Sequence, residues 1–142
     1  MPLSDHRLRV GVDAVEVDRL ARLSEDHPDS FEEIFTTREL EYCAGKRRRS
    51  EHLAARFAAK EAVLKAFGTG ISQRMRWTDV EVVNDARGRP EITLGGAVAQ
   101  FAERHGLTQL DVSLTHTSGL AIAHAVTLWE RPAEEAEPCA ST

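Results

Sequence analysis

Charged side chains interrupt the apolar pattern of the segment Ser50–Gly70, SEHLAARFAAKEAVLKAFGTG. Most of its residues are strong helix formers, and a glycine-rich turn follows at Gly68–Gly70. At about 100° per residue, Arg56 and Lys60 project from the same arc as the apolar side chains, and Glu61 lies at its edge. An amphipathic helix whose cations extend to water explains each charge singly. Three charges beside a G-T-G turn favour a site for an anionic, metal-bound ligand, because buried charges need partners.

A carboxylate at Asp13 supplies a second candidate ligand. It lies in the β-branched run V-G-V-D-A-V at Val10–Val15, where a carboxylate has no packing role. The alternative is an Asp that ends a strand or caps the following helix. Two carboxylates from separate elements suit Mg²⁺, which usually takes one or two protein carboxylates and completes its shell with phosphate oxygens and water. We therefore predict that Asp13 and Glu61 bind Mg²⁺.

Two further features are cationic. The run Lys46-Arg47-Arg48-Arg49 comes just before the long helix. Taken alone, such a run is typical of a solvated loop. His116 ends a predicted strand between Thr115 and Thr117, a position at which a lone histidine is ordinarily a surface residue. No Cys/His cluster indicates zinc.

Three segments, in order, closely resemble those of the bacterial holo-[acyl-carrier-protein] synthases, the small members of the 4′-phosphopantetheinyl transferase superfamily. They are G-V-D-A-V-E-V-D-R at Gly11–Arg19, R-F-A-A-K-E-A-V-L-K-A-F-G-T-G at Arg56–Gly70 and V-S-L-T-H-T at Val112–Thr117. The similarity runs from about Leu8 to Trp129, and the middle motif is the most specific. The resemblance implies transfer of 4′-phosphopantetheine from coenzyme A to a serine of an apo acyl carrier protein, with release of adenosine 3′,5′-bisphosphate. It also implies a need for Mg²⁺ and a homotrimer with active sites between subunits.

The resemblance assigns roles to individual residues. Lys65 matches the family lysine before A-F-G-T-G and joins Asp13 and Glu61 as a catalytic residue, with Lys60 as the alternative neutraliser of phosphate oxygens. The basic run resembles the family segment that contacts the 3′-phosphate of coenzyme A. His116 matches a family histidine that lies beside the coenzyme A site. Backbone N–H groups of the glycine turn are candidates to hold phosphate. The expected substrate-binding residues are Arg47, Arg48, Arg49, Arg56, Lys60, Gly68, Thr69, Gly70, His116 and Thr117.

Carrier proteins are acidic, so their docking surface should be basic. Arg19 matches the family arginine after G-x-D, and Arg22 lies three residues further on the same helix face. The proton of the carrier serine would go to Glu61 itself or to a metal-bound water relayed through Glu61, and both routes stay open. The sequence also leaves open whether the carrier serves fatty-acid, polyketide or other synthesis.

The elements that must position these residues predict a single α+β domain over residues 1–130, with an antiparallel sheet and a long helix. Segment 131–142, RPAEEAEPCAST, lacks apolar periodicity and is predicted to be a disordered tail. Thr36 and Glu39 form a capping box for a helix through about Ala44, and Ser50 caps the long helix. Strands are expected at about Leu8–Val15, Trp77–Val83, Glu91–Leu94, Leu110–Thr115 and Leu120–Leu128, and further helices at Glu16–Ser24, Pro28–Phe35 and Ala97–His105.

Composition excludes several classes of protein. A chain of 142 residues is long enough for one domain. Superfamily members that are fused tandems of two such domains would be about twice this length, so we expect this chain to self-associate. The net charge of −5 and 6% aromatic content disfavour nucleic-acid binding. No apolar run predicts a membrane span, the first residues do not read as a signal peptide, and the distant Cys43 and Cys139 indicate reduced thiols in the cytoplasm. The alternative function is a non-catalytic carrier-binding or trimeric scaffold domain, against which the joint presence of Asp13, Glu61 and Lys65 argues.

Overall fold

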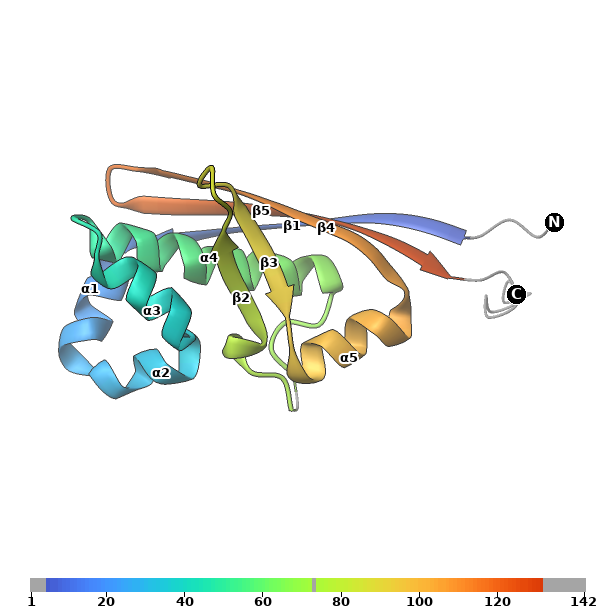
Figure 1. Cartoon of the computed structure of the whole chain (residues 1–142), viewed down its shortest axis with the longest axis horizontal. Helices are drawn as coiled ribbons and strands as arrows, with labels where there is room; N and C mark the ends of the chain where they lie inside the picture. Colours follow the sequence, from blue (N-terminus) through green and yellow to red (C-terminus); the bar gives the residue numbers. More distant parts are fainter. Residues whose placement is uncertain (1–4, 73, 132–142) are drawn as a thin grey trace.

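The computed structural model describes residues 5–72 and 74–131, which form two antiparallel sheets around one long helix (Figure 1). This arrangement confirms the predicted single α+β domain. The strands are β1 (Asp5–Glu16), β2 (Val80–Asn84), β3 (Pro90–Leu94), β4 (Leu107–Thr117) and β5 (Leu120–Arg131). The helices are α1 (Val17–Asp26), α2 (Phe31–Ile34), α3 (Thr37–Ala44), α4 (Arg49–Phe67) and α5 (Gly96–His105), with 3₁₀ turns at Pro28–Ser30 and Trp77–Asp79.

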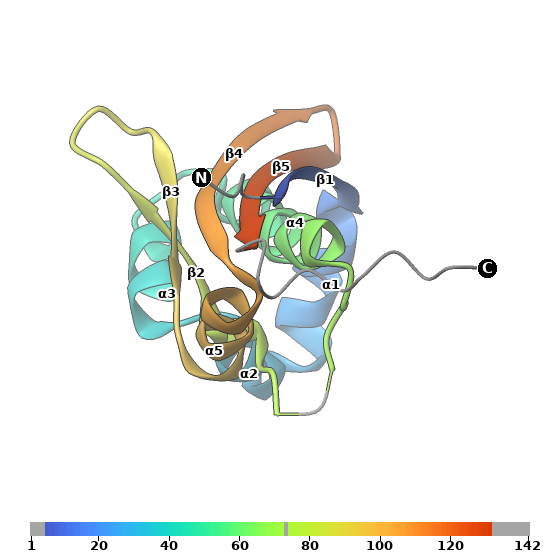
Figure 2. The same ribbon diagram turned by 90° about the vertical axis from the view of Figure 1, so that its right-hand side faces the viewer.

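The main sheet has the order β1-β5-β4, and β2 and β3 form a separate hairpin. Both neighbours of β5 run antiparallel to it, with Gly11 opposite Ala125 and Val112 also opposite Ala125. Figure 2 shows the three strands arching over α4. Helix α4 also contacts α1, α3 and β2, so it forms the axis of the fold.

A close approach between β1 and α4 explains the alanines of the long helix. Most of α4 is buried, including Ala62 and Ala66. A Cβ atom added at Gly11 would lie 2.0 Å from the Ala62 carbonyl oxygen and 2.7 Å from the Ala66 nitrogen. Only glycine therefore fits at this crossing. Because residues two apart on a strand share a face, the contact also carries Asp13 towards α4.

The alternation of β1 leaves its other face uncovered. Gly11, Asp13 and Val15 are buried towards α4. Leu8 and Val10 point the opposite way and are 67% and 66% exposed. Val126 of β5 lies directly opposite Val10 and is also exposed. Within one chain, the main sheet thus presents an apolar face to solvent.

Several predicted boundaries are confirmed. Gly68 and Gly106 end α4 and α5 in left-handed conformations, with φ of 80° and 82°. The capping box of Thr36 and Glu39 is present at the start of α3. Segment 132–142, predicted to be disordered, lies outside the described residues.

Two boundary predictions are wrong. Helix α4 begins at Arg49, after Arg48 and without a side-chain cap, so Ser50 lies inside its first turn. Trp77–Asp79 is a 3₁₀ turn, and β2 begins only at Val80. The Asp79 carboxylate accepts from the Arg76 N–H at 3.0 Å, and this local bond holds the chain in a turn.

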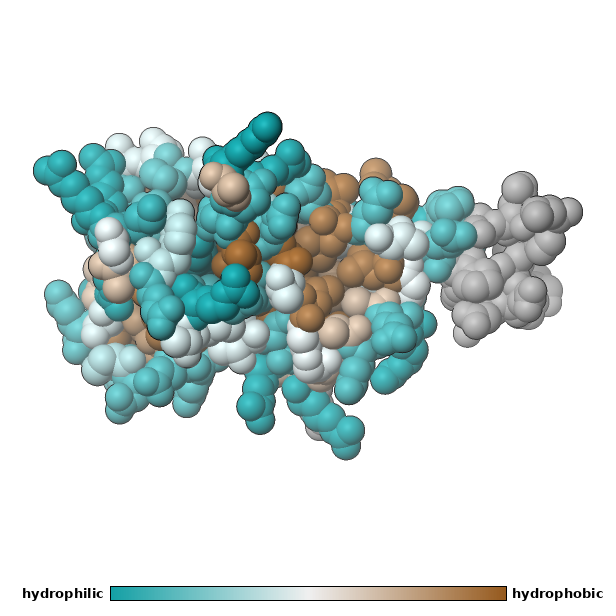
Figure 3. All heavy atoms as spheres, in the orientation of Figure 1, coloured by the Kyte–Doolittle hydropathy of each residue, from teal (hydrophilic) through white to brown (hydrophobic). Residues whose placement is uncertain are grey.

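Hydrophobic side chains close the space between the hairpin and the main sheet. In Figure 3 hydrophobic atoms are visible along β4, between β3 and α5. The partly buried side chains Leu94, Phe101 and Leu110 pack here against the core. They join the hairpin to the body of the domain.

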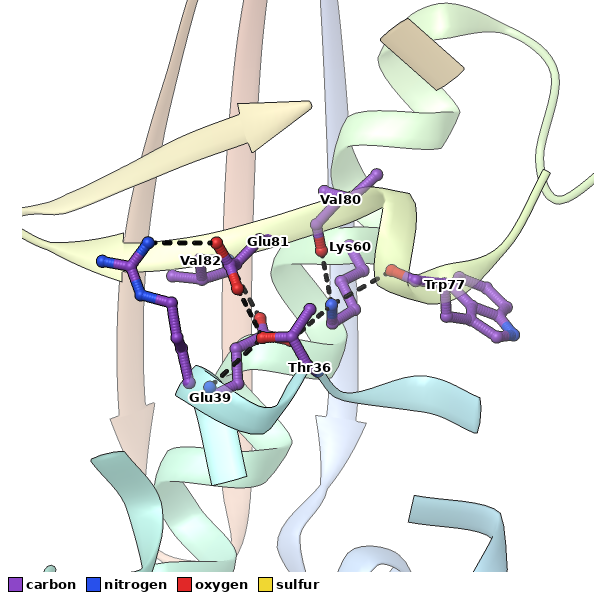
Figure 4. A network of polar contacts seen from close by, with 8 residues as sticks. Thr36, Glu39, Lys60, Trp77, Val80, Glu81 and Val82 are labelled. Carbon is purple, nitrogen blue, oxygen red and sulfur yellow. Dashed lines mark hydrogen bonds and ion pairs between the residues drawn. The ribbon is translucent and has the colours of Figure 1, made fainter. Parts of the chain in front are cut away.

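An ion pair inside the protein fixes the hairpin to α3 and α4 (Figure 4). Lys60 is fully buried, and its Nζ lies 2.8 Å from Oε1 of the equally buried Glu39. The same ammonium donates to the carbonyl oxygens of Trp77, at 3.0 Å, and Val80. The other Glu39 oxygen accepts from the Val82 N–H at 2.9 Å. Burial lowers the pKa of Lys60, an effect that the Glu39 carboxylate opposes.

Lys60→Met should destabilise the protein by about 3–5 kcal/mol, because it leaves the Glu39 charge buried without its cation. The matched control is Arg89→Met, which breaks the Arg89–Asp111 pair, whose side chains are 65% and 62% exposed. That change should cost about 1 kcal/mol or less. Urea unfolding at one fixed protein concentration measures both, and equal losses would contradict a structural role for the buried pair.

Candidate functional site

Asp13 of β1 and Lys65 of α4 meet where the strand passes the end of the helix. Lys65 Nζ lies 2.8 Å from Asp13 Oδ1 and donates to the Val12 carbonyl oxygen at 3.1 Å. Asp13 is only 9% exposed, whereas more than half of the Lys65 side chain faces solvent. Glu61 lies one turn before Lys65 on the same helix face. The structure thus brings together the three residues predicted to be catalytic.

The two carboxylates form an electrostatically crowded pair. Burial and the adjacent Asp13 raise the pKa of Glu61 to about 7, against the opposing charges of Arg19 and Lys65. The hydrogen bond to Asp13 raises the pKa of Lys65. Asp13 Oδ2 is buried and has no hydrogen-bond partner among the described residues. A buried carboxylate oxygen without a donor is costly, so this arrangement fits a bound cation.

The chemistry of the donors restricts which cation fits. Within residues 5–72 and 74–131 no group of three or more His, Cys, Asp or Glu side chains converges as a metal site. An ion that needs a complete shell of protein ligands is therefore a poor match. Mg²⁺ accepts one or two carboxylates and takes its other ligands from phosphate and water, so Asp13 and Glu61 fit it.

A second cluster lies on the side of α4 that faces α3 and the hairpin. A pocket of about 390 Å³ is lined there by Tyr42, Lys46, Arg56 and residues 82–86. The Arg56 guanidinium stacks 4.0 Å from the centre of the Tyr42 ring and donates to Asn84 Oδ1. Lys46 Nζ lies 4.6 Å from the same ring. Two cations around an aromatic ring suit an anionic ligand with a planar group.

His116 continues this cluster along the sheet. Its Nδ1 lies 3.4 Å from Glu51 Oε2, and its ring is 6.3 Å from that of His52. His52 in turn lies 6.0 Å from the Tyr42 ring. Burial lowers the pKa of His52, and the charges of Arg56 and Lys46 lower it further. The exposed Thr117 follows His116 at the end of β4.

The basic run divides among several directions. Arg48 pairs with Glu51 at 3.7 Å, and Arg49 donates to Ser24 Oγ at 3.1 Å while its guanidinium lies over Phe31. Arg47 is exposed. Lys46, which we did not include among the substrate-binding residues, is the member of the run that lines the pocket.

Two other predicted ligand groups are engaged elsewhere. Lys60 is buried against Glu39, so its ammonium has no face for a phosphate. The backbone N–H of Gly68 donates to the Lys65 carbonyl oxygen, and those of Thr69 and Gly70 donate to that of Leu64. The expectation of a backbone phosphate cradle at this turn is therefore corrected. The turn satisfies helix carbonyls that would otherwise lack donors.

The two clusters lie on different sides of α4. Glu61 and Arg56 are five residues apart, which places them about 140° apart around the helix axis. The main sheet covers one side of α4, and α1, α3 and β2 contact it elsewhere. The carboxylate cluster (Asp13, Glu61, Lys65) and the basic cluster (Tyr42, Lys46, His52, Arg56, Asn84, His116) are thus separate surfaces of one chain.

A groove beside the carboxylate cluster contains both predicted docking arginines. It measures about 530 Å³, and Arg19, Arg22, Phe57 and Trp77 are among its lining residues. The Arg19 guanidinium lies 6.0 Å from the Phe57 ring centre. The charged lining is mixed, with the exposed Asp26 and Glu33 beside the two arginines. The arginines and the apolar floor suit a partner with acidic and apolar side chains.

Sequence reasoning missed Tyr42, His52 and Asn84, which come from three different elements. No spacing along the chain connects them, so only the fold brings them together. Glu39 was recognised as a capping residue but not as the partner of Lys60. A lysine on the buried arc of a helix does predict an acidic partner, and that signal was available.

The geometry agrees with comparisons to known proteins. The sequence model of the 4′-phosphopantetheinyl transferase superfamily matches residues 9–125, and the chain belongs to that superfamily. Within it, the chain is similar to the holo-[acyl-carrier-protein] synthase of Geobacter sulfurreducens, at 49% identity over 123 residues that cover 86% of this chain and 96% of the relative. These matches confirm the resemblance inferred from the three motifs.

Solved structures agree. The holo-[acyl-carrier-protein] synthase from Neisseria meningitidis superposes with a TM-score of 0.77 at 31% identity, covering 84% of this chain and 96% of that one. A complex of the Chronobacterium ammoniagenes enzyme with coenzyme A gives 0.78 at 32% identity, with coverage of 88% and 99%.

Asp13→Asn and Glu61→Gln should each keep the fold but weaken binding of a divalent cation, because each removes one of two charged ligands. Mn²⁺, a probe with similar preference for oxygen ligands, can be titrated against the protein by its effect on water proton relaxation. Asp18→Asn, an exposed carboxylate on α1, is the matched control and should bind as the wild type. Unchanged binding in all three variants would contradict a cation site at Asp13 and Glu61.

Proposed function

We propose that this chain transfers the 4′-phosphopantetheine group of coenzyme A to a serine of an apo acyl carrier protein and releases adenosine 3′,5′-bisphosphate. The observation that carries the proposal is the carboxylate cluster, in which Asp13, Glu61 and Lys65 converge and one buried oxygen of Asp13 has no partner among the described residues. The names of the relatives support the same activity.

The alternative is a carrier-binding or scaffold domain of the same fold without catalysis. A scaffold has no use for two crowded carboxylates, one of them with its pKa raised to about 7. Such crowding raises the energy of the folded protein and persists where it serves a function. The carboxylate cluster therefore favours the enzyme.

Transfer of this kind depends on positioning and on neutralising charge. The serine oxygen attacks the phosphorus next to the pantetheine arm, and the bond from that phosphorus to the bisphosphate oxygen breaks. Lys65, whose ammonium faces solvent beside Asp13, is placed to neutralise a phosphate oxygen. Glu61, the more exposed carboxylate, is placed to accept the serine proton directly or through a water.

A Mg²⁺ ion would be held by Asp13 and Glu61. When bound, it would polarise the phosphate oxygens and stabilise the charge that develops on the leaving group. Asp13 contributes the buried oxygen that has no donor in the described part of the chain, and Lys65 holds the other oxygen in place.

Coenzyme A also carries a 3′-phosphate, which needs a basic pocket remote from the bond that breaks. We assign this group to the basic cluster, where Lys46 and Arg56 flank the Tyr42 ring. His116, whose ring lies 6.3 Å from that of His52, would extend this surface together with Thr117, which follows it, and the exposed Arg47, which follows Lys46. Arg48 and Arg49, which contact Glu51 and Ser24, have at most a supporting role.

The two clusters lie on different sides of α4, so we propose that each active site joins the carboxylate cluster of one copy to the basic cluster of the next. Contact between two different surfaces is head-to-tail, and it forms a closed ring when the rotation between copies closes. The family resemblance implies that this ring is a homotrimer. The exposed face formed by Leu8, Val10 and Val126 is apolar enough to form its centre.

The carrier is proposed to dock in the groove between Arg19 and Trp77. Its acidic side chains would meet Arg19 and Arg22, and its apolar side chains would meet Phe57. Arg19 also acts electrostatically on Glu61, so the groove opens next to the carboxylate cluster. This position delivers the carrier serine to the reacting phosphate.

We propose a cytoplasmic location. The free, buried thiol of Cys43 is in keeping with a reducing compartment. Among the described residues, no helix has the length and apolar character needed to cross a membrane.

The direct test incubates apo acyl carrier protein with the chain, coenzyme A and Mg²⁺ and measures the carrier mass. The wild type should add one phosphopantetheine group, and EDTA should stop the reaction until Mg²⁺ is restored. Asp13→Asn and Lys65→Ala should fold and lose at least about a hundredfold in rate, the scale of losing one preorganised charge contact. A carrier that binds but gains no mass would support the scaffold reading.

Loss of positive charge at the basic cluster should affect coenzyme A more than dephospho-coenzyme A, which lacks the 3′-phosphate. For Lys46→Ala with Arg47→Ala, KM for coenzyme A should rise at least about tenfold, the value of one charge-assisted contact, while kcat changes little. Arg104→Ala, a cation at the other end of the domain, is the control. An equal rise in KM for coenzyme A and dephospho-coenzyme A would contradict the assignment of the 3′-phosphate to this pocket.

Charge reversal in the groove should weaken the carrier and spare coenzyme A. Arg22→Glu should raise KM for the carrier by about tenfold at low salt, and the effect should shrink as salt increases. Arg104→Glu makes the same charge change away from the groove and should leave that KM unaltered. If both variants behave alike, the carrier responds to net charge and the docking assignment fails.

A further inference from the structure

A pocket of about 540 Å³ lies outside both clusters, at the end of the domain where β1 begins and β5 ends. Figure 2 looks onto this end and shows the start of β1, the end of β5 and the end of α4 grouped above α5. Three aromatic side chains form the floor. The Phe67 ring lies 5.0 Å from that of Trp129 and 5.9 Å from that of Phe101.

Cations surround this floor. Arg7 and Arg9 reach it from β1, and Arg104 and His105 from the last turn of α5. Arg7 lies directly opposite Trp129 in the ladder between β1 and β5. One carboxylate, Asp5, approaches Arg7 at 3.7 Å. In the part of the chain that the structure describes, Arg9 and Arg104 form no ion pair, so the pocket carries an excess of positive charge.

A structural role explains only half of these cations. Basic side chains in the last turn of a helix stabilise its negative end, which accounts for Arg104 and His105. Arg7 and Arg9 come from a strand and have no such role. Two elements thus place like charges around one hollow, an arrangement that favours an anionic occupant.

We infer that the occupant is the chain's own segment 132–142, PAEEAEPCAST. It carries Glu134, Glu135 and Glu137 and no lysine or arginine. It begins directly after β5, three residues beyond Trp129 of the floor. Its eleven residues can span up to about 36 Å, so the pocket lies well within reach. Its prolines and alanines suit the aromatic floor.

The segment lies beyond the part of the chain shared with the superfamily, since that match ends at residue 125. The proposed occupant is thus this chain's own extension, whereas the pocket belongs to the domain. The proposed docking rests on charge complementarity and on a short tether, which raises the local concentration of the segment at the pocket.

A nitroxide attached to Cys139 of the full chain tests this placement, since the other cysteine, Cys43, is fully buried. NMR signals of Arg7, Arg9, Arg104 and the Trp129 indole should be lost and should return when the nitroxide is reduced. Changing Glu134, Glu135 and Glu137 to lysine should preserve those signals. The control variant makes the same charge change at the exposed Glu25, Glu41 and Glu91 and should lose the signals as the wild type does.

Equal signal loss in the tail-reversed and wild-type proteins would overturn the inference, because the tether alone would then explain it. In a second experiment, isotope-labelled Cys139→Ser chains are mixed with chains that carry the nitroxide but no isotope. Signal loss in this mixture would also overturn the inference, since the segment would then dock on a neighbouring copy. A charge-swapped protein, in which Arg7, Arg9 and Arg104 become glutamate and Glu134, Glu135 and Glu137 become lysine, should again lose the NMR signals around the pocket. The readout is independent of transfer, so it stands or falls separately from the proposed function.

Discussion

The distance between β1 and α4 at Gly11 decides most of what this domain does. The strand passes so close to the Ala62 carbonyl that a single methyl group at Gly11 has no space. This contact brings Asp13, two residues further along the same face, into the reach of Glu61 and Lys65. The chain thereby places a buried carboxylate beside a half-buried one, where each raises the energy of the other unless a cation joins them. A wider crossing would leave two solvated carboxylates with no reason to share an ion.

The buried Lys60–Glu39 pair performs the complementary task on the other side of α4. By donating to the carbonyl oxygens of Trp77 and Val80, Lys60 fixes the start of β2, and Asn84 is the last residue of that strand. Trp77 lines the proposed carrier groove, and Asn84 orients Arg56 in the basic cluster. One buried charge therefore positions parts of two surfaces. This dependence explains why a lysine that has no access to a ligand lies directly beside the candidate catalytic Glu61.

The pairing of Asp13 with Glu61 was inferred from the ligand preference of Mg²⁺, and the role of Lys65 beside them from the family resemblance. Sequence periodicity was sufficient for the fold class and the long helix, because each depends on local patterns. It was insufficient where a side chain has two possible uses. Lys60 and Arg49 are cations within or beside a motif expected to bind anions, yet Lys60 pairs with Glu39 and Arg49 donates to Ser24. The glycine turn reads as a phosphate cradle, but its N–H groups are needed by the end of α4. Arg56 and His116 of the basic cluster were predicted, but Tyr42, His52 and Asn84 were not, since they converge only through the packing of three elements.

The proposed active site is shared between subunits, with one copy supplying the carboxylates and another supplying the basic cluster. Complementation measures it most directly. Asp13→Asn chains lose transfer, and Lys46→Glu chains lose it at coenzyme A concentrations far below their raised KM. The two are mixed, allowed to exchange subunits and assayed at such a concentration with apo carrier protein. If the sites are shared, random pairing in a symmetric ring should restore about a quarter of the wild-type activity. If the mixture stays as inactive as its components while exchange is complete, both clusters must act within one chain, and the account of a shared site is contradicted.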